Sequence, residues 1–134
     1  MTEDLTWLSA SVALFFVHLL AESVIGSRSF SLKDMMGPRD NISGLPPMLA
    51  RAKRATANMI ESMVMFVPLV LIAAITGKSN EMTAYGAMTF FFARLVYAPL
   101  YWFGVPVLRS LVWGVGVVGL VMIFLQVLPF SGAA

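Results

Sequence analysis

The sequence of 134 residues contains no cysteine, only one histidine and few charged side chains. Without cysteine there can be no disulfide, no thiolate metal site and no cysteine nucleophile, so any thiol chemistry needs a thiol supplied by a substrate. One histidine and seven acidic residues also disfavour a metal site, and we expect no metal cofactor. Nine basic residues in so apolar a chain form no extended basic face, so nucleic acid is not an expected partner.

Charged residues make up 12% of the chain and hydrophobic residues 59%. Soluble domains usually carry about 25% charged residues, so this composition indicates an integral membrane protein. Four apolar segments, at about 5–26, 48–76, 82–103 and 106–128, are each long enough to span a bilayer, which takes about 20 residues. The acidic Glu3 and Asp4 are atypical of a secretory signal, and we expect the first helix to stay in the protein.

The connections between these segments predict the architecture. Residues 27–47 are rich in turn formers and charge and predict a polar loop, whereas the breaks at 77–81 and 104–106 are short. Short connections join antiparallel neighbours, so the sequence predicts one all-α domain over 1–134, an up-down-up-down transmembrane four-helix bundle. Six of the nine basic residues lie between Arg28 and Arg54, so the positive-inside rule places loop 27–47 and the turn near 104 in the cytoplasm, with both termini opposite.

A polar stripe follows the second helix. Arg51, Arg54, Asn58 and Glu61 are three, four and three residues apart and therefore share one helix face. Asn58 and Glu61 lie about 10 to 15 Å further along the helix than Arg51. Polar groups at that depth in a membrane are candidates for function. The alternatives are that Arg51 and Lys53 anchor the helix at the interface and that Glu61 only pairs with Arg54.

The third helix carries a second polar face. Arg94, Tyr97 and Tyr101 are spaced by three and four residues, and Arg109 follows the break at 104–106. The tyrosines could instead form an interfacial aromatic belt, and Arg109 could be a headgroup anchor. The predicted topology places this face at the same membrane side as the stripe of the second helix, so the two can converge.

His18 and Glu22 stand four residues apart near the same end of the first helix. They predict either a hydrogen-bonded pair that holds the bundle together or an auxiliary functional pair. Glu22 also leaves open a small proton-coupled multidrug transporter, which would use a membrane-embedded glutamate in its first helix. The long 27–47 loop counts against that alternative.

The segments RATANMIE (54–61) and RLVYAPLY (94–101), together with Arg109, resemble the MAPEG family, the membrane-associated proteins in eicosanoid and glutathione metabolism. This family includes microsomal glutathione transferases and leukotriene-forming synthases. The resemblance covers nearly the whole chain and is closest to the bacterial branch. It implies a homotrimer in a bacterial inner membrane, with glutathione as co-substrate bound between subunits near the cytoplasmic leaflet.

The resemblance also implies roles for individual residues. Arg109 would stabilise the glutathione thiolate for attack on a hydrophobic electrophile from the bilayer, in a transferase that could also act as a peroxidase. A family member that binds lipid or thiol without catalysis is the alternative. The expected glutathione-binding residues are Arg54, Asn58, Glu61, Tyr97, Tyr101, Arg94, Arg51 and Arg28.

The chain departs from the family pattern at two places. Ser62 stands where leukotriene-forming members carry a tyrosine. Arg109 lies one residue later than a gapless alignment puts the catalytic arginine, which falls on Leu108. Either the preceding turn is one residue longer, or the arginine points in a different direction.

Overall fold

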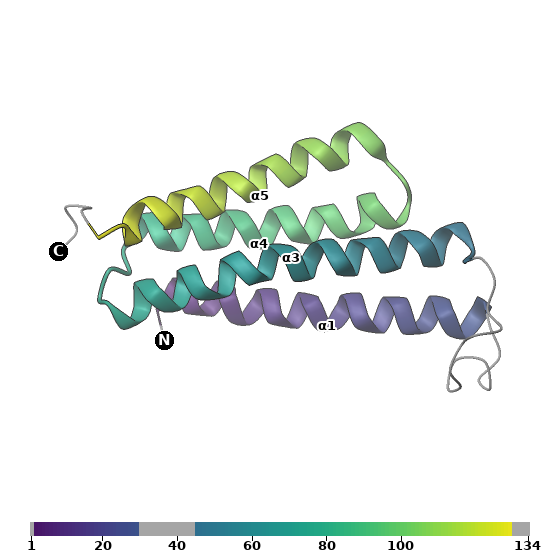
Figure 1. Cartoon of the computed structure of the whole chain (residues 1–134), viewed down its shortest axis with the longest axis horizontal. Helices are drawn as coiled ribbons and strands as arrows, with labels where there is room; N and C mark the ends of the chain where they lie inside the picture. The colour runs from purple at the N-terminus through teal and green to yellow at the C-terminus, as the bar shows by residue number, and fades with distance from the viewer. Residues whose placement is uncertain (1, 30–44, 130–134) are drawn as a thin grey trace.

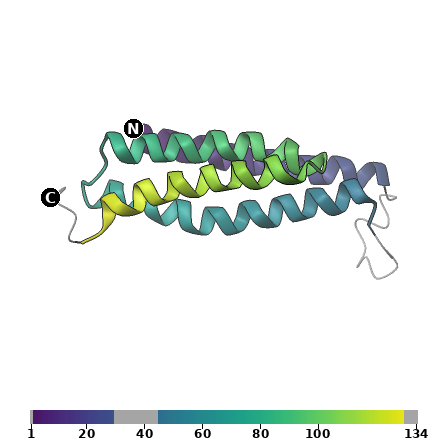
Figure 2. The same cartoon turned by 90° about the horizontal axis from the view of Figure 1, so that it is seen from above.

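The computed structural model describes residues 2–29 and 45–129 and contains four α-helices in this part of the chain (Figure 1). They are α1 (Glu3–Ser29), α3 (Pro47–Ile75), α4 (Glu81–Trp102) and α5 (Pro106–Val127). Successive helices run antiparallel and lie side by side along one common axis (Figures 1 and 2). The predicted all-α four-helix architecture is confirmed. Most of the predicted 27–47 loop lies outside the described residues, and 27–29 and Pro47 belong to the flanking helices.

Local sequence explains where the helices begin and end. Pro47 and Pro106 occupy the first helical positions of α3 and α5, where a missing N–H costs no hydrogen bond. Asn80 caps α4, because its side chain accepts from the Thr83 amide while the Thr83 hydroxyl accepts from the Asn80 amide. The short turns after α3 and α4 contain Gly77 and Gly104 at φ values of 70° and 74°, a conformation that glycine adopts without strain.

The core of the bundle is small and apolar. Phe66 of α3 and Phe90 of α4 stack with their ring centroids 4.0 Å apart. The α4 and α5 backbones meet at Gly86 and Gly119, where a Cβ added to Gly86 would lie 2.7 Å from the Gly119 carbonyl oxygen. Glycine is used here because only a residue without a side chain permits such close backbone packing.

Large apolar side chains cover much of the outer surface, including Phe16, Leu20, Val64, Leu111 and Val118. Among the described helices, α1, α3 and α5 are long and apolar enough to cross a membrane. The fourth predicted span, α4, has 22 residues and runs beside α5, but polar residues such as Thr83, Tyr85 and Arg94 interrupt its apolar run. An outer surface of this kind suits lipid and not water.

A polar cluster fastens the end of the bundle at which α1 begins and α5 ends. The carboxylate of Asp4, only 1% exposed, accepts hydrogen bonds from the Ser79 hydroxyl at 2.8 Å and the Thr83 hydroxyl at 3.0 Å. The Thr2 hydroxyl donates to the same carboxylate. Asp4 thereby joins the start of α1 to the α3–α4 turn and the first turn of α4. From sequence alone, Asp4 is only an acidic residue atypical of a secretory signal, and its contacts with other helices are not evident.

Candidate functional site

The opposite end of the bundle brings together the end of α1, the start of α3 and the α4–α5 turn (Figure 1). There, α3, α4 and α5 form an open cleft of about 240 Å³. Its lining residues are Asn58, Tyr97, Tyr101, Arg109, Ser110 and Trp113. Four of the six come from the two polar faces that the sequence analysis singled out.

A second cavity, of about 380 Å³, lies at the end fastened by Asp4. Its charged lining residues, Glu3, Asp4 and Glu81, are all acidic, and Asp4 already accepts three side-chain hydrogen bonds. The smaller cleft is the better functional candidate, because it joins a cation to hydrogen-bonding side chains.

Two arginines lie against one tyrosine ring in the cleft. The guanidinium carbon of Arg109 is 4.5 Å from the centroid of Tyr101, and that of Arg54 is 6.0 Å from it. Neither arginine forms an ion pair with a described residue. Two cations close together without a carboxylate partner favour an anionic ligand, to which arginine can bind through two parallel hydrogen bonds.

Arg109 occupies the early part of α5. This helix begins at Pro106 after Val105, which provides no side-chain cap. Free N–H groups at a helix start carry partial positive charge, so they add to the field of Arg109. Leu108 is 49% exposed and does not line the cleft. At this turn it is therefore Arg109 that enters the cleft, one residue later than the gapless alignment suggests.

Arg94 lies behind the cleft and not in its lining. Its side chain is 1% exposed, its Nη1 donates to Asn58 Oδ1 at 2.7 Å, and its guanidinium carbon is 4.2 Å from the Tyr97 ring centroid. Ser62, which replaces the tyrosine of leukotriene-forming members, donates its hydroxyl to the Asn58 backbone carbonyl at 3.0 Å. Asn58 is thus held on two sides by neighbouring polar groups.

Arg51 supports the α4–α5 turn. Its Nε donates to the carbonyl of Trp102 at 2.8 Å, and its side chain would lie 3.5 Å from a Cβ placed on Gly104. Arg51 therefore ties the first turns of α3 to the end of α4. Arg28 is exposed in the last turn of α1 and does not line the cleft.

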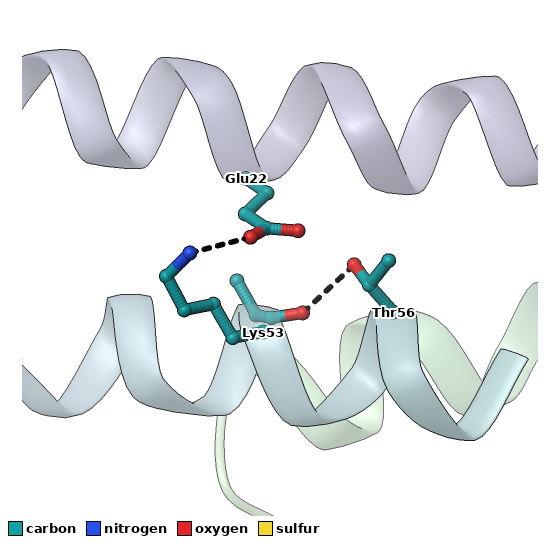
Figure 3. A network of polar contacts seen from close by, with 4 residues as sticks. Glu22, Lys53 and Thr56 are labelled. Atoms are coloured by element: carbon teal, nitrogen blue, oxygen red, sulfur yellow. Dashed lines mark hydrogen bonds and ion pairs between the residues drawn. The ribbon is translucent and has the colours of Figure 1, made fainter. Parts of the chain in front are cut away.

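Lys53 and Glu22 form an ion pair between α3 and α1, with 2.8 Å between Nζ and Oε1 (Figure 3). One turn further along α3, the Thr56 hydroxyl donates to the carbonyl of Ala52. Lys53 thus forms a contact with a neighbouring helix, whereas its sequence position suggests an anchor at the membrane interface.

The expected hydrogen bond between His18 and Glu22 is not formed. His18 is 1% exposed, and neither ring nitrogen has a hydrogen-bond partner among the described residues. Its ring instead meets the edge of Trp102, with the centroids 5.7 Å apart. Of the two alternatives, the hydrogen-bonded pair is not observed, because Glu22 instead binds Lys53 of another helix. The auxiliary functional role stays a prediction.

Arg54 and Glu61 lie exposed on α3. Within the described residues no ion pair joins them, so the proposed pairing along the helix is not observed. Of the predicted stripe, Asn58 lines the cleft, whereas Arg54 and Glu61 do not. The guanidinium group of Arg54 is, however, 6.0 Å from the ring centroid of Tyr101, which is a lining residue. Two cleft residues, Ser110 and Trp113, were missed, although Trp113 lies four residues after Arg109 and so shares its helix face.

Within residues 2–29 and 45–129, no three histidine, cysteine or acidic side chains come together in a group that could hold a metal. The side chains that line the cleft are those of arginine, tyrosine, asparagine, serine and tryptophan.

Comparison with known proteins gives one match. The sequence profile of the MAPEG family matches residues 6–129, nearly the whole chain. No curated protein and no solved structure matches the chain. Together with the apolar helices, this match identifies an integral membrane protein. The four-helix fold and the profile match lead to one conclusion: the chain belongs to the MAPEG family.

Proposed function

We propose that this protein is a membrane-bound glutathione transferase, with glutathione as co-substrate. The observation that carries the proposal is the cleft, in which Arg109 lies over Tyr101 beside the amide of Asn58. Arg54 approaches the same tyrosine ring from outside the lining, and neither arginine has an acidic partner among the described residues. Glutathione is an anionic peptide with two carboxylates, one amino group and a thiol. These groups match two arginines, an amide and a carboxylate. The carboxylate is that of Glu61, which lies on α3 together with Arg54 and Asn58.

In the proposed reaction, Arg54 binds a carboxylate of glutathione and Glu61 pairs with its amino group. Arg109 lies beside the sulfur and raises the fraction of thiol present as thiolate, since a nearby cation stabilises the negative charge. The start of α5 contributes in the same direction. The thiolate then attacks an electrophilic carbon, the new C–S bond forms, and the leaving group departs with its electron pair. The same thiolate could reduce a hydroperoxide.

The cleft also has features suited to an apolar second substrate. Trp113 is 47% exposed at its edge, on a helix whose outer surface is apolar. An electrophile dissolved in the bilayer could reach the sulfur from that side without crossing water. Trp113 would then provide a flat apolar contact for it.

We further propose that a second copy of the chain completes each site in a homotrimer. The cleft of about 240 Å³ is smaller than the roughly 300–1,000 Å³ typical of ligand sites. Arg54 and Glu61 are exposed on a membrane helix, where charges left in lipid are costly. Burial of both against a neighbouring subunit, with glutathione between them, removes that cost. The positive-inside pattern supports a cytoplasmic position of the cleft, and we propose a bacterial inner membrane as the location of the protein.

The transporter alternative receives less support. Glu22, the glutamate it would need for proton coupling, is bound by Lys53 at 2.8 Å. The carboxylate is therefore already engaged by a lysine of a neighbouring helix.

The test is a turnover assay of the purified protein with glutathione and an aryl chloride. Arg109→Ala should lower kcat by about tenfold or more, because it removes the cation that stabilises the thiolate. Lys78→Ala, which removes a cation at the other end of the bundle, is the matched control and should retain full activity. Equal rates for Arg109→Ala and the unmodified protein would refute the role of Arg109.

Thermal stabilisation by glutathione separates catalysis from binding. A ligand that binds only the folded state raises the melting temperature, and the stabilisation grows with the logarithm of one plus its concentration over Kd. Stabilisation without turnover would identify a non-catalytic thiol-binding member. Absence of both would contradict the proposed function.

A further inference from the structure

Arg94 is a buried cation whose contacts point to one task. In the described part of the chain, its hydrogen bond goes to Asn58 Oδ1, while its Nε and Nη2 have no partner. No carboxylate forms an ion pair with it there. Burying a cation without a carboxylate is costly, so its retention calls for a reason. Arg94 does not line the cleft, so that reason is not direct contact with a ligand there.

The pairing with Arg94 fixes which way the Asn58 amide faces. A guanidinium group can only donate hydrogen bonds, so the amide atom turned towards it must be the oxygen. The amide group is planar and its nitrogen points away from its oxygen. Because Asn58 lines the cleft and its oxygen is turned inward to Arg94, the amide nitrogen is the group left for a ligand.

We propose that Arg94 is a positioning residue that holds the Asn58 side chain with its amide N–H group towards the cleft. This N–H group therefore binds a carbonyl or carboxylate oxygen of the ligand. The proposal rests on the proposed function, in which that oxygen belongs to glutathione. Without Arg94 the amide could turn by half a rotation and present its oxygen to the ligand instead. The contact of Arg94 with the Tyr97 ring means that it supports a second lining residue too.

The first variant that tests this inference is Asn58→Asp. Aspartate keeps an acceptor for Arg94 and makes the contact charged, so the melting temperature should equal or exceed that of the unmodified protein. It offers no N–H group, so glutathione should bind about tenfold more weakly or worse, as for a lost hydrogen bond to a charged ligand. If Asn58 served only as the structural partner of Arg94, Asn58→Asp would bind glutathione as well as the unmodified protein, and the proposal would be wrong.

Two substitutions of Arg94 test positioning directly. Arg94→Met keeps an unbranched chain of similar length but cannot donate to Asn58, and glutathione affinity should fall about tenfold. Arg94→Lys keeps one donor and should recover most of that loss, whereas a merely structural role would change melting temperatures without this order of affinities. Affinity of Arg94→Met equal to that of the unmodified protein overturns the proposal. If Arg94→Met does not fold, affinity of Arg94→Lys as low as that of Asn58→Asp overturns it.

Side-chain amide NMR separates this inference from the proposed function. The sequence has three asparagines, Asn41, Asn58 and Asn80, so asparagine-labelled protein gives few signals, and Asn58→Asp identifies the relevant one. Glutathione should shift the Asn58 signal. If the unmodified protein binds no glutathione, the proposed function fails. The positioning role is then judged without ligand, and it too fails if Arg94→Met, which cannot donate to Asn58, leaves the Asn58 signal unchanged.

Discussion

Four arginines near the cleft differ in what each one touches. Arg109 lies over Tyr101 inside the cleft, and Arg54 approaches the same ring from α3. Arg94 is buried behind Asn58, and Arg51 binds the carbonyl that ends α4. Equal charge therefore does not mean equal function. Substitution of Arg109 or Arg54 should affect the ligand, that of Arg94 a lining residue, and that of Arg51 a turn.

Arg51→Ala should loosen the α4–α5 turn. The change frees the Trp102 carbonyl and removes the side chain beside Gly104, at a cost of about 1 kcal/mol, because the hydrogen bond is only part-buried. Hydrogen exchange of the amides of residues 103–105 should become faster, and turnover should fall because Arg109 follows this turn. Arg28→Ala, at an exposed position of α1, is the control. Unchanged exchange at 103–105 in Arg51→Ala would show that the turn does not depend on this contact.

At the scale of whole helices, α5 is packed unevenly. Its buried residues are Gly116, Gly119, Leu120 and Ile123, all from the middle of the helix onward. In its first half, Val107 and Leu111 are 71% and 63% exposed, and the helix diverges from α4 towards its start (Figure 1). The glycine contact at one end and the divergence at the other create the space that Arg109, Ser110 and Trp113 line.

Gly86→Ala should destabilise the contact between α4 and α5. Its new methyl group would lie 2.7 Å from a backbone oxygen and 2.8 Å from Ile123, so the helices must move apart. Such overpacking typically costs about 1–3 kcal/mol. Gly114→Ala is a matched control on α5, since a Cβ there meets nothing within 4 Å. In the isolated chain it should be neutral or slightly stabilising, because alanine favours helix over glycine. Thermal unfolding in detergent measures both, and equal melting temperatures would disprove the role of this contact.

The molecule as a whole has a fastened end and an open end. Asp4 connects two helices and a turn at one end, whereas the cleft opens at the other. This separation allows stability and ligand binding to depend on different residues.

Asp4→Ala should therefore lower stability without altering the chemistry of the cleft. The change leaves the Ser79 and Thr83 hydroxyls without their charged acceptor, and we expect a loss of about 2–4 kcal/mol. Glu3→Ala, at a neighbouring exposed position, should have little effect. Thermal unfolding gives the stability, and the glutathione Kd at a temperature where both variants are folded should not change. A large increase in Kd for Asp4→Ala would show that the two ends are coupled.

The proposed trimer makes a further prediction at this scale. Native mass spectrometry in a mild detergent should detect three copies, and glutathione should increase the trimer fraction because its proposed site lies between subunits. Glu61→Gln should weaken this effect, because it removes the charge proposed to bind the amino group. A monomer or an antiparallel dimer that glutathione does not change would contradict the assembly.

Much of this arrangement could be predicted from sequence, because helix length, turn position and the spacing of three and four residues are local properties. Asn58, Tyr97, Tyr101 and Arg109 were identified in that way, and all four line the cleft. Contacts between helices could not be predicted, because spacing along one helix does not reveal its neighbours. That is why the Lys53–Glu22 pair, the burial of Arg94 and the polar cluster of Asp4 became evident only in three dimensions.

The start of α1 and the end of α5 both lie at the end fastened by Asp4 (Figure 1). The residues of α5 that line the cleft lie 14 to 18 residues before its last residue, so at 1.5 Å per residue that end of the helix is about 21–27 Å from the cleft. A fluorescent or affinity label attached before α1 or after α5 would therefore not obstruct the cleft. We expect labels at these two positions to lie on the same side of the membrane. Fusions to a reporter that is active in only one compartment would therefore reveal the orientation of the protein in a living cell.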